Sequence, residues 1–83
     1  MAVRAYVLIE TAVGKTREVK QALMNADMAN AKVLAVDAVT GPYDLIAQVE
    51  GVDLDALGTG VAQGVQSTAG ITRTLTCLVV SLG

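Results

Sequence analysis

The sequence has no histidine, tryptophan or phenylalanine, and it contains one cysteine, one proline and two tyrosines in 83 residues. The missing histidine removes the side chain that most often acts as a general base near neutral pH. The single cysteine, Cys77, excludes an internal disulfide and agrees with a reducing compartment. Without histidine or a CxxC motif, the chain also lacks a recognisable set of metal ligands. We therefore expect no metal, no cofactor and no enzymatic activity.

Basic charge and long apolar runs are also scarce. Six lysines and arginines against eight aspartates and glutamates give a formal net charge of −2, and only Lys15, Arg17 and Lys20 come close to forming a cluster. A chain without a basic stripe is a poor candidate for direct nucleic-acid contact. No apolar run reaches the roughly 18 residues of a membrane span, and the start, MAVRAYVLIE, lacks the features of a signal peptide. We expect a soluble, cytoplasmic protein.

Hydrophobic residues, in contrast, are abundant: they make up 53% of the chain. A domain of this length is marginally stable alone, because it buries a small fraction of its surface. An apolar surface that one small domain cannot hide is typical of association between chains. We therefore expect residues 1–83 to form a single domain that oligomerises.

An alternating pattern opens the chain, and a helical pattern follows it. Residues 3–9 alternate with a period of two, which predicts a strand. After Gly14, apolar residues recur at i, i+3, i+4 and i+7, the stripe of an amphipathic helix that ends between residues 25 and 30. The residues of this stripe are Val19, Ala22, Leu23 and Ala26.

The remaining pattern predicts a hairpin, a second helix and a last strand. Residues 33–39 and 43–50 read as strands joined by the turn Thr40-Gly41-Pro42, which is typical of an antiparallel hairpin. Asp53 is a natural N-cap for a second amphipathic helix. The apolar residues of that helix are Leu54, Leu57, Val61 and Val65. Residues 71–80, rich in threonine, leucine and valine, predict the last strand.

The order β-α-β-β-α-β predicts an α+β, ferredoxin-like fold, in which a four-stranded antiparallel sheet carries two helices on one face. The helix-covered face would hold Val3, Ala5, Val7, Ile9, Leu45, Ala47 and Val49. The opposite face would hold Tyr6, Leu8, Ile46 and Gln48, with Thr74 or Arg73 and Leu78 or Val80, depending on the register. Burying this second apolar face adds several kcal/mol at about 25 cal/mol per Å². We expect a sheet-to-sheet dimer, a dimeric α/β sandwich.

The second helix contains three glycines, Gly58, Gly60 and Gly64, each of which costs about 1 kcal/mol relative to alanine in a helix. The simpler interpretation, which we adopt, is a loosened helix whose cost is offset by packing. In the alternative, Gly60 and Gly64 lie one turn apart and let another backbone approach closely.

Candidate polar groups lie at the hairpin and in the last strand. Thr72, Thr74 and Thr76 alternate, which predicts that their hydroxyls share one face; β-propensity alone explains such a pattern, and a hydrogen-bonding ladder is the functional alternative. The pair Tyr43-Asp44 either finishes the turn or lines a polar pocket. Cys77, in an apolar strand, is interpreted as a buried, inert thiol rather than a nucleophile.

These segments resemble those of a known family. Thr40-Gly41-Pro42-Tyr43-Asp44-Leu45 resembles the TGxYD hairpin of the Lrp/AsnC effector-binding domain, also called the RAM domain (regulation of amino acid metabolism). Gly70-Ile71-Thr72-Arg73-Thr74-Leu75-Thr76 resembles the Gly-Val/Ile-x-x-Thr-x-Thr strand of that family. The first strand, with Gly14 and Val19, is similar too, so that the resemblance spans essentially the whole chain.

The resemblance implies a domain that dimerises through its sheets, dimers that assemble further, and small effectors, commonly amino acids, bound where dimers meet. The ligand-binding residues that it implies are Thr40, Gly41, Tyr43, Asp44, Ile71, Thr72, Thr74 and Thr76. In this interpretation Asp44 pairs with an amino group, backbone N–H groups around Gly41 meet a carboxylate, and threonine hydroxyls fix the ligand's orientation.

One departure from the family pattern affects the functional hypothesis. Regulators of that family carry an N-terminal helix-turn-helix domain, whereas this chain begins two residues before its first strand. We therefore expect a stand-alone form, an oligomeric effector-binding module that meets full-length Lrp/AsnC regulators through shared interfaces. The alternatives are a ligand-independent assembly partner of such a regulator and a small cofactor-free dimeric α+β barrel enzyme, which would need aromatic or histidine residues in a cavity.

Overall fold

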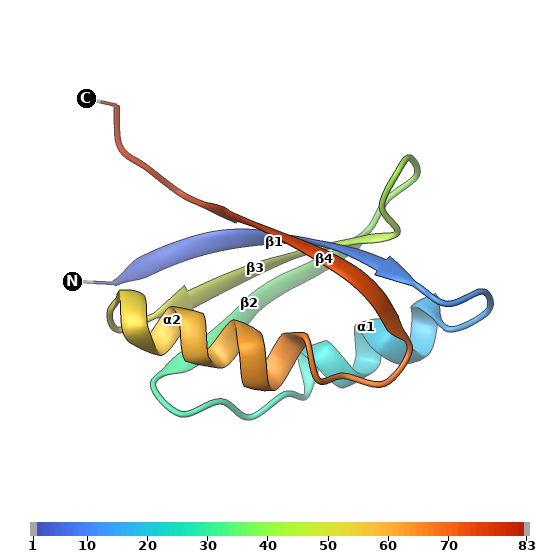
Figure 1. Cartoon of the computed structure of the whole chain (residues 1–83), viewed down its shortest axis with the longest axis horizontal. Helices are drawn as coiled ribbons and strands as arrows, with labels where there is room; N and C mark the ends of the chain where they lie inside the picture. Colours follow the sequence, from blue (N-terminus) through green and yellow to red (C-terminus); the bar gives the residue numbers. More distant parts are fainter. Residues whose placement is uncertain (1, 83) are drawn as a thin grey trace.

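A computed structural model describes residues 2–82, which form a four-stranded antiparallel sheet with helices on one face (Figure 1). The elements are β1 (Val3–Thr11), α1 (Thr16–Met24), β2 (Ala31–Ala38), β3 (Leu45–Gly51), α2 (Leu54–Gly60), a π-helical turn η1 (Val61–Val65) and β4 (Ile71–Leu78). The strand order is β2-β3-β1-β4. This element order and helix placement confirm the predicted ferredoxin-like fold. Among residues 2–82, no helix has the length and apolar character that crossing a membrane requires.

The core is built by strict alternation along the two central strands. β1 and β3 pair antiparallel with Val7 opposite Ala47 and Ile9 opposite Leu45, and all four side chains are fully buried. The helical segments cover this face with Val19, Leu23, Leu57, Val61 and Val65. The predicted helix-covered face is therefore confirmed.

Three residues of the predicted apolar stripes lie outside the core. Ala26 is partly buried and follows α1, which ends at Met24. Ala22 is exposed, because the packed stripe of α1 is limited to Val19 and Leu23. Leu54 is 57% exposed. It lies in the first turn of α2, where it lines a groove beside the edge strand β4 instead of packing on the sheet.

The start of α2 follows the prediction, and two glycines of the predicted second helix, Gly60 and Gly64, have close neighbours. The Asp53 carboxylate accepts a hydrogen bond of 2.7 Å from the backbone N–H of Ala56, which makes it the expected N-cap. A Cβ atom at Gly60 would lie 2.9 Å from Cβ of Ala31, and one at Gly64 would lie 2.7 Å from Cγ of Met28. Gly60 therefore accommodates Ala31, the first residue of β2, and Gly64 accommodates the side chain of Met28. These close neighbours are side chains and not another backbone, so they agree with the interpretation that packing offsets the cost of the glycines.

The register of β4 decides which residues reach the open face of the sheet. Leu75 lies opposite Leu8 and Cys77 opposite Tyr6, whereas Thr74, Thr76 and Leu78 lie opposite buried residues of β1. Of the predicted alternatives, Arg73 belongs to the open face and Thr74 does not; the placement of Leu78 there is wrong.

Cys77 is exposed rather than buried. The strand ends at Leu78 instead of Val80.

The open face has the apolar character that the sequence predicts. Tyr6 is 44% exposed and Leu75 is 49% exposed, and both stand on the side of the sheet away from the helices. On the same face, Leu8 of β1 lies opposite Ile46 of β3, and both are partly buried. A contiguous apolar patch of this kind is uncommon on an isolated small domain.

The glycine contacts of α2 predict opposite effects of alanine at two neighbouring positions. Gly58→Ala adds a methyl group where no atom lies within 4 Å, so we expect the free energy of unfolding to rise by about 0.5–1 kcal/mol. Gly60→Ala places its methyl group against the Cβ of Ala31, which the β2 backbone holds, so we expect a loss of about 1–3 kcal/mol. Urea unfolding at fixed protein concentration measures both. Equal effects of the two substitutions on the free energy of unfolding would refute the close approach of Gly60 to Ala31.

Candidate ligand-binding site

Four of the predicted site residues lie in the hairpin between β2 and β3: Thr40, Gly41, Tyr43 and Asp44. This hairpin rises from the sheet on the side opposite to the helices (Figure 1). The backbone N–H of Val39 donates to the carbonyl of Asp44 at 2.9 Å and closes the loop. Gly41 has a φ of 139°, a conformation that favours glycine. Thr40 and Gly41 are exposed, whereas Tyr43 and Asp44 are partly buried.

The carboxylate of Asp44 connects the hairpin to the end of β1. Its Oδ2 accepts hydrogen bonds from the backbone N–H of Thr11 at 2.8 Å and from the Thr11 hydroxyl at 3.3 Å. The Thr11 hydroxyl also lies 2.7 Å from the hydroxyl of Thr16, the first residue of α1. The turn interpretation of Asp44 is thus modified: the carboxylate bonds to backbone, but on β1 rather than within its own turn. It fixes the hairpin's position.

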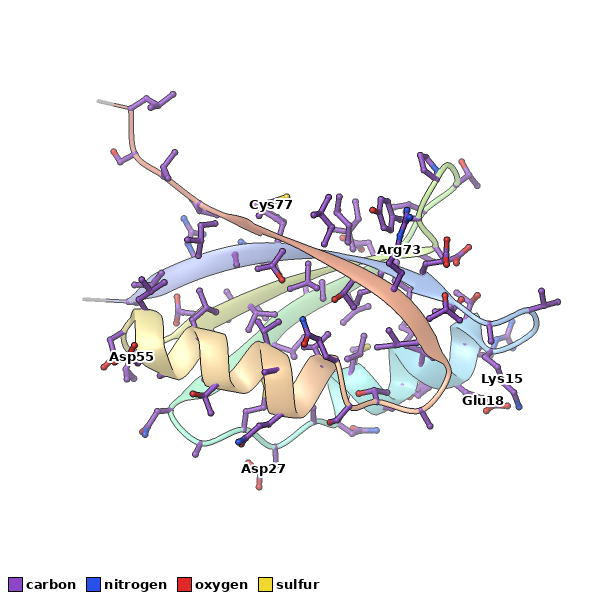
Figure 2. The ribbon with its side chains drawn as sticks, in the orientation of Figure 1. Lys15, Glu18, Asp27, Asp55, Arg73 and Cys77 are labelled. Atoms are coloured by element: carbon purple, nitrogen blue, oxygen red, sulfur yellow. The ribbon has the colours of Figure 1, made fainter. Side chains whose placement is uncertain are left out.

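Tyr43 brings the hairpin into contact with β4. The Arg73 guanidinium donates from Nη2 to the Tyr43 hydroxyl at 3.2 Å, and its carbon lies 5.2 Å from the centre of the Tyr43 ring. Such a cation–π contact contributes about 0.5–1 kcal/mol at an exposed site. Figure 2 shows Arg73 on the open side of the sheet, near the hairpin. The two halves of the predicted site, far apart in sequence, therefore touch through this pair.

The threonines of β4 do not share one face as predicted, and the alternative of a hydrogen-bonding ladder is therefore not realised. The pairing of β1 with β4 shifts between Glu10 and Thr11, and Thr72 is left without a direct partner. The Thr72 hydroxyl instead bonds to Oε1 of Glu10 at 2.7 Å. Thr74 and Thr76 lie opposite buried residues of β1, on the helix side. The bulge has broken the alternation on which the prediction relied.

A polar cavity of about 330 Å³ lies at the beginning of β4. Its lining consists of Gln66, Ile71, Thr72, Arg73 and Thr74. Three predicted residues, Ile71, Thr72 and Thr74, thus share one cavity. Thr76 lines a separate groove of about 380 Å³ between α2 and β4. The hairpin residues line neither space.

Sequence reasoning missed two residues of this cavity, Gln66 and Arg73. Gln66 follows the π-helical turn, in which its backbone N–H donates to the carbonyl of Val61, five residues earlier, at 2.8 Å. Its side chain donates to the Thr74 hydroxyl at 3.3 Å. Periodicity gives no signal for an extra residue in a helix, so Gln66 was not predictable. Arg73 was visible as the one charged residue between the threonines.

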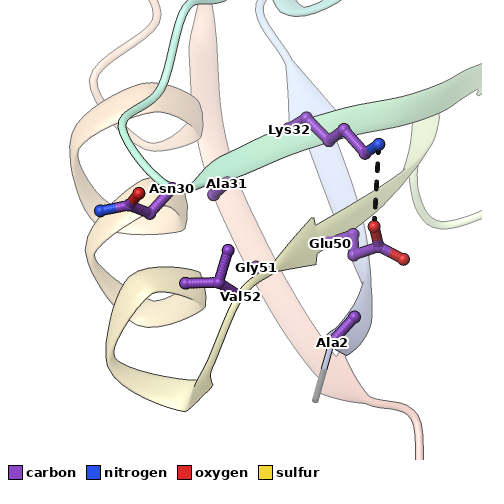
Figure 3. A pocket seen from close by; sticks show the side chains of 7 residues that line it. All are labelled: Ala2, Asn30, Ala31, Lys32, Glu50, Gly51 and Val52. Atoms are coloured by element: carbon purple, nitrogen blue, oxygen red, sulfur yellow. Dashed lines mark ion pairs between the residues drawn. The ribbon is translucent and has the colours of Figure 1, made fainter.

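Another cavity, of about 290 Å³, lies where β2 begins and β3 ends (Figure 3). Its lining includes Lys32 and Glu50, whose Nζ and Oε1 atoms are 3.8 Å apart. Because these two charges neutralise each other and none of the predicted residues lines the cavity, we do not assign a ligand to it.

The comparisons with known proteins place the whole domain in one group. The family model of the Lrp/AsnC ligand binding domain matches residues 4–82. The crystal structure of FFRP-DM1 is 33% identical, with a TM-score of 0.83, over 94% of this chain and 99% of that chain. The structure of TTHA0845 from Thermus thermophilus is 33% identical, with a TM-score of 0.84, over 98% of this chain and 96% of that chain. No curated protein matches.

A more distant structure has a bound amino acid. It is the complex of the transcriptional regulator NMB0573 from Neisseria meningitidis with L-Met, which is 21% identical to this chain with a TM-score of 0.77. The match covers 96% of this chain and 51% of the regulator, and it shows a shared fold.

The contacts of Asp44 predict a structural effect of its replacement. Asp44→Ala removes two hydrogen bonds to Thr11, so we expect the free energy of unfolding to fall by about 1–3 kcal/mol. Thr40→Ala, in the same exposed loop, is the control, for which we expect a change within about 0.5 kcal/mol. Chemical unfolding at fixed protein concentration measures both. If Asp44→Ala is as stable as the control, the carboxylate does not hold the hairpin.

Proposed function

Since the chain belongs to the Lrp/AsnC ligand binding domain family, we propose that it is an effector-binding regulatory module whose ligand is an amino acid or a related small molecule. The contact between Tyr43 and Arg73 is the observation that carries the location of the site, because it joins the hairpin to the polar start of β4. The ligand site that we propose comprises Thr40, Gly41, Tyr43 and Asp44 of the hairpin, together with Ile71, Thr72 and Thr74, and Glu10, Gln66 and Arg73 are added. Thr76 is not part of it, because it lines the groove between α2 and β4.

The chemistry of these groups suits a zwitterion. The Arg73 guanidinium and backbone N–H groups around Gly41 are donors for a carboxylate. The carboxylate of Glu10, which already bonds to Thr72, is an acceptor for an ammonium group. Asp44 is less suited to that role than the sequence alone indicates, since its Oδ2 already accepts two hydrogen bonds from Thr11. L-Met bound to the regulator NMB0573 supports an amino acid as the ligand class.

Assembly is the second part of the proposal. The exposed apolar face around Tyr6 and Leu75 supports a homodimer formed sheet to sheet, with dimers assembling further. We propose that residues 1–83 act as one domain, and that the same surfaces allow mixed assembly with full-length Lrp/AsnC regulators. A ligand-independent assembly partner is the alternative function, and it is favoured by the same apolar face.

The effector proposal predicts selective stabilisation by one amino acid or a small group of them. A ligand at about 100 times its dissociation constant stabilises by roughly 2.7 kcal/mol, which a thermal-unfolding screen of the common amino acids detects. We expect Tyr43→Phe to weaken the binding of the selected amino acid about tenfold, because Arg73 loses its hydroxyl partner. Tyr6→Phe, on the open face, is the matched control and should bind normally. If no amino acid raises the unfolding temperature while the oligomer stays intact, the result favours the alternative function, a ligand-independent assembly partner.

The assembly proposal predicts that one charge on the open face separates the subunits. We expect Leu75→Glu to convert the dimer into monomers, because it places a carboxylate opposite Leu8 in the middle of the apolar patch. Leu54→Glu changes a residue of similar exposure on α2 and should leave the dimer intact. Sedimentation velocity measures the mass of each variant. Dimers of Leu75→Glu as stable as those of the control would contradict a sheet-to-sheet interface.

A further inference from the structure

A cavity of about 580 Å³ lies between α1 and the strands at the base of the hairpin. Its lining consists of Thr16, Arg17, Lys20 and Gln21 from α1, together with Ala38 at the end of β2 and Leu45 at the start of β3. None of the residues of the proposed effector site lines it. Its volume falls within the range of small-molecule sites in proteins, about 300–1,000 Å³.

The charge at this cavity is positive and not neutralised within the domain. Arg17 and Lys20 lie three positions apart on α1, which places them one turn apart on neighbouring parts of the helix surface. Within residues 2–82 neither forms an ion pair, whereas Lys15 pairs with Glu18. No acidic side chain belongs to the lining. In a chain with a net charge of −2, two unpaired cations at one cavity create a local site of positive potential.

The other lining groups complement an anion that carries a carbon skeleton. Thr16 and Gln21 add a hydroxyl and an amide, which are hydrogen-bonding groups. Ala38, which is exposed, provides an apolar surface, and the fully buried Leu45 lies behind it. Arginine binds oxyanions through paired N–H donors, and lysine binds them as a point charge.

We propose that this cavity binds a small molecule with an oxyanion group, a phosphate ester or a carboxylate, on an apolar skeleton. The oxyanion meets Arg17 and Lys20, and the skeleton lies on Ala38. The site is separate from the proposed effector site and does not depend on it. It is connected to the hairpin, because Thr16 bonds to Thr11, which bonds to Asp44.

The test is a titration of the isotope-labelled full chain, followed by NMR at constant ionic strength. The probes are inorganic phosphate, phenyl phosphate and phenylacetate. We expect saturable shifts of the backbone amide signals of residues 16–21 and of Leu45. Phenyl phosphate should bind several-fold more tightly than inorganic phosphate, because only phenyl phosphate has an apolar ring that packs against Ala38. Tighter binding of phenyl phosphate than of phenylacetate assigns a phosphate ester, and the reverse assigns a carboxylate.

Two double variants separate this site from general attraction to positive charge. Arg17→Gln with Lys20→Gln should weaken phenyl phosphate binding at least tenfold. Arg4→Gln with Lys15→Gln removes the same charge from outside the cavity and should bind normally. Equal loss in both variants, undiminished binding in the first, or shifts that do not saturate would overturn the proposal. If the first variant fails to fold, the proposal is judged by the unmodified chain: shifts confined to residues 16–21 and Leu45 support it, and shifts elsewhere overturn it.

Discussion

Strand β1 is hydrogen-bonded on both sides, to β3 and to β4, and the rest of the structure depends on its register. Its alternate residues Ala5, Val7 and Ile9 are fully buried under the helices. Because successive side chains of a strand point to opposite faces, the same register places Tyr6 and Leu8 on the open face. A slip by one residue would exchange the core with the surface. One strand thus fixes both the core and the apolar face proposed for assembly.

Two local irregularities interrupt the regular pattern, and both affect the residues proposed to bind the effector. The bulge between β1 and β4 frees Thr72 from the ladder and turns it to Glu10. The π-helical turn shifts Gln66, which then reaches Thr74. Bulges and π-helical turns occur often beside functional sites, because each redirects a side chain without unfolding the element.

Two sets of contacts hold the hairpin in place. On the open side Tyr43 meets Arg73, and at the end of β1 Asp44 is bonded to Thr11. Through Thr11 the network continues to Thr16 on α1, beside the cavity with unpaired cations. The proposed effector site and the proposed oxyanion site therefore share one ordered loop, although they lie on different surfaces of the domain.

The sequence by itself determined the order of the elements, the N-cap at Asp53 and the buried face of β1 and β3, because these follow from local periodicity and capping chemistry. That the hairpin and the start of β4 form one site stays a prediction of the sequence. Only the tertiary structure decided that Arg73 reaches Tyr43, that Thr72 leaves the threonine row and that Gly60 accommodates Ala31. Each of these depends on register or close packing between segments distant in sequence, which residue patterns along one segment do not encode.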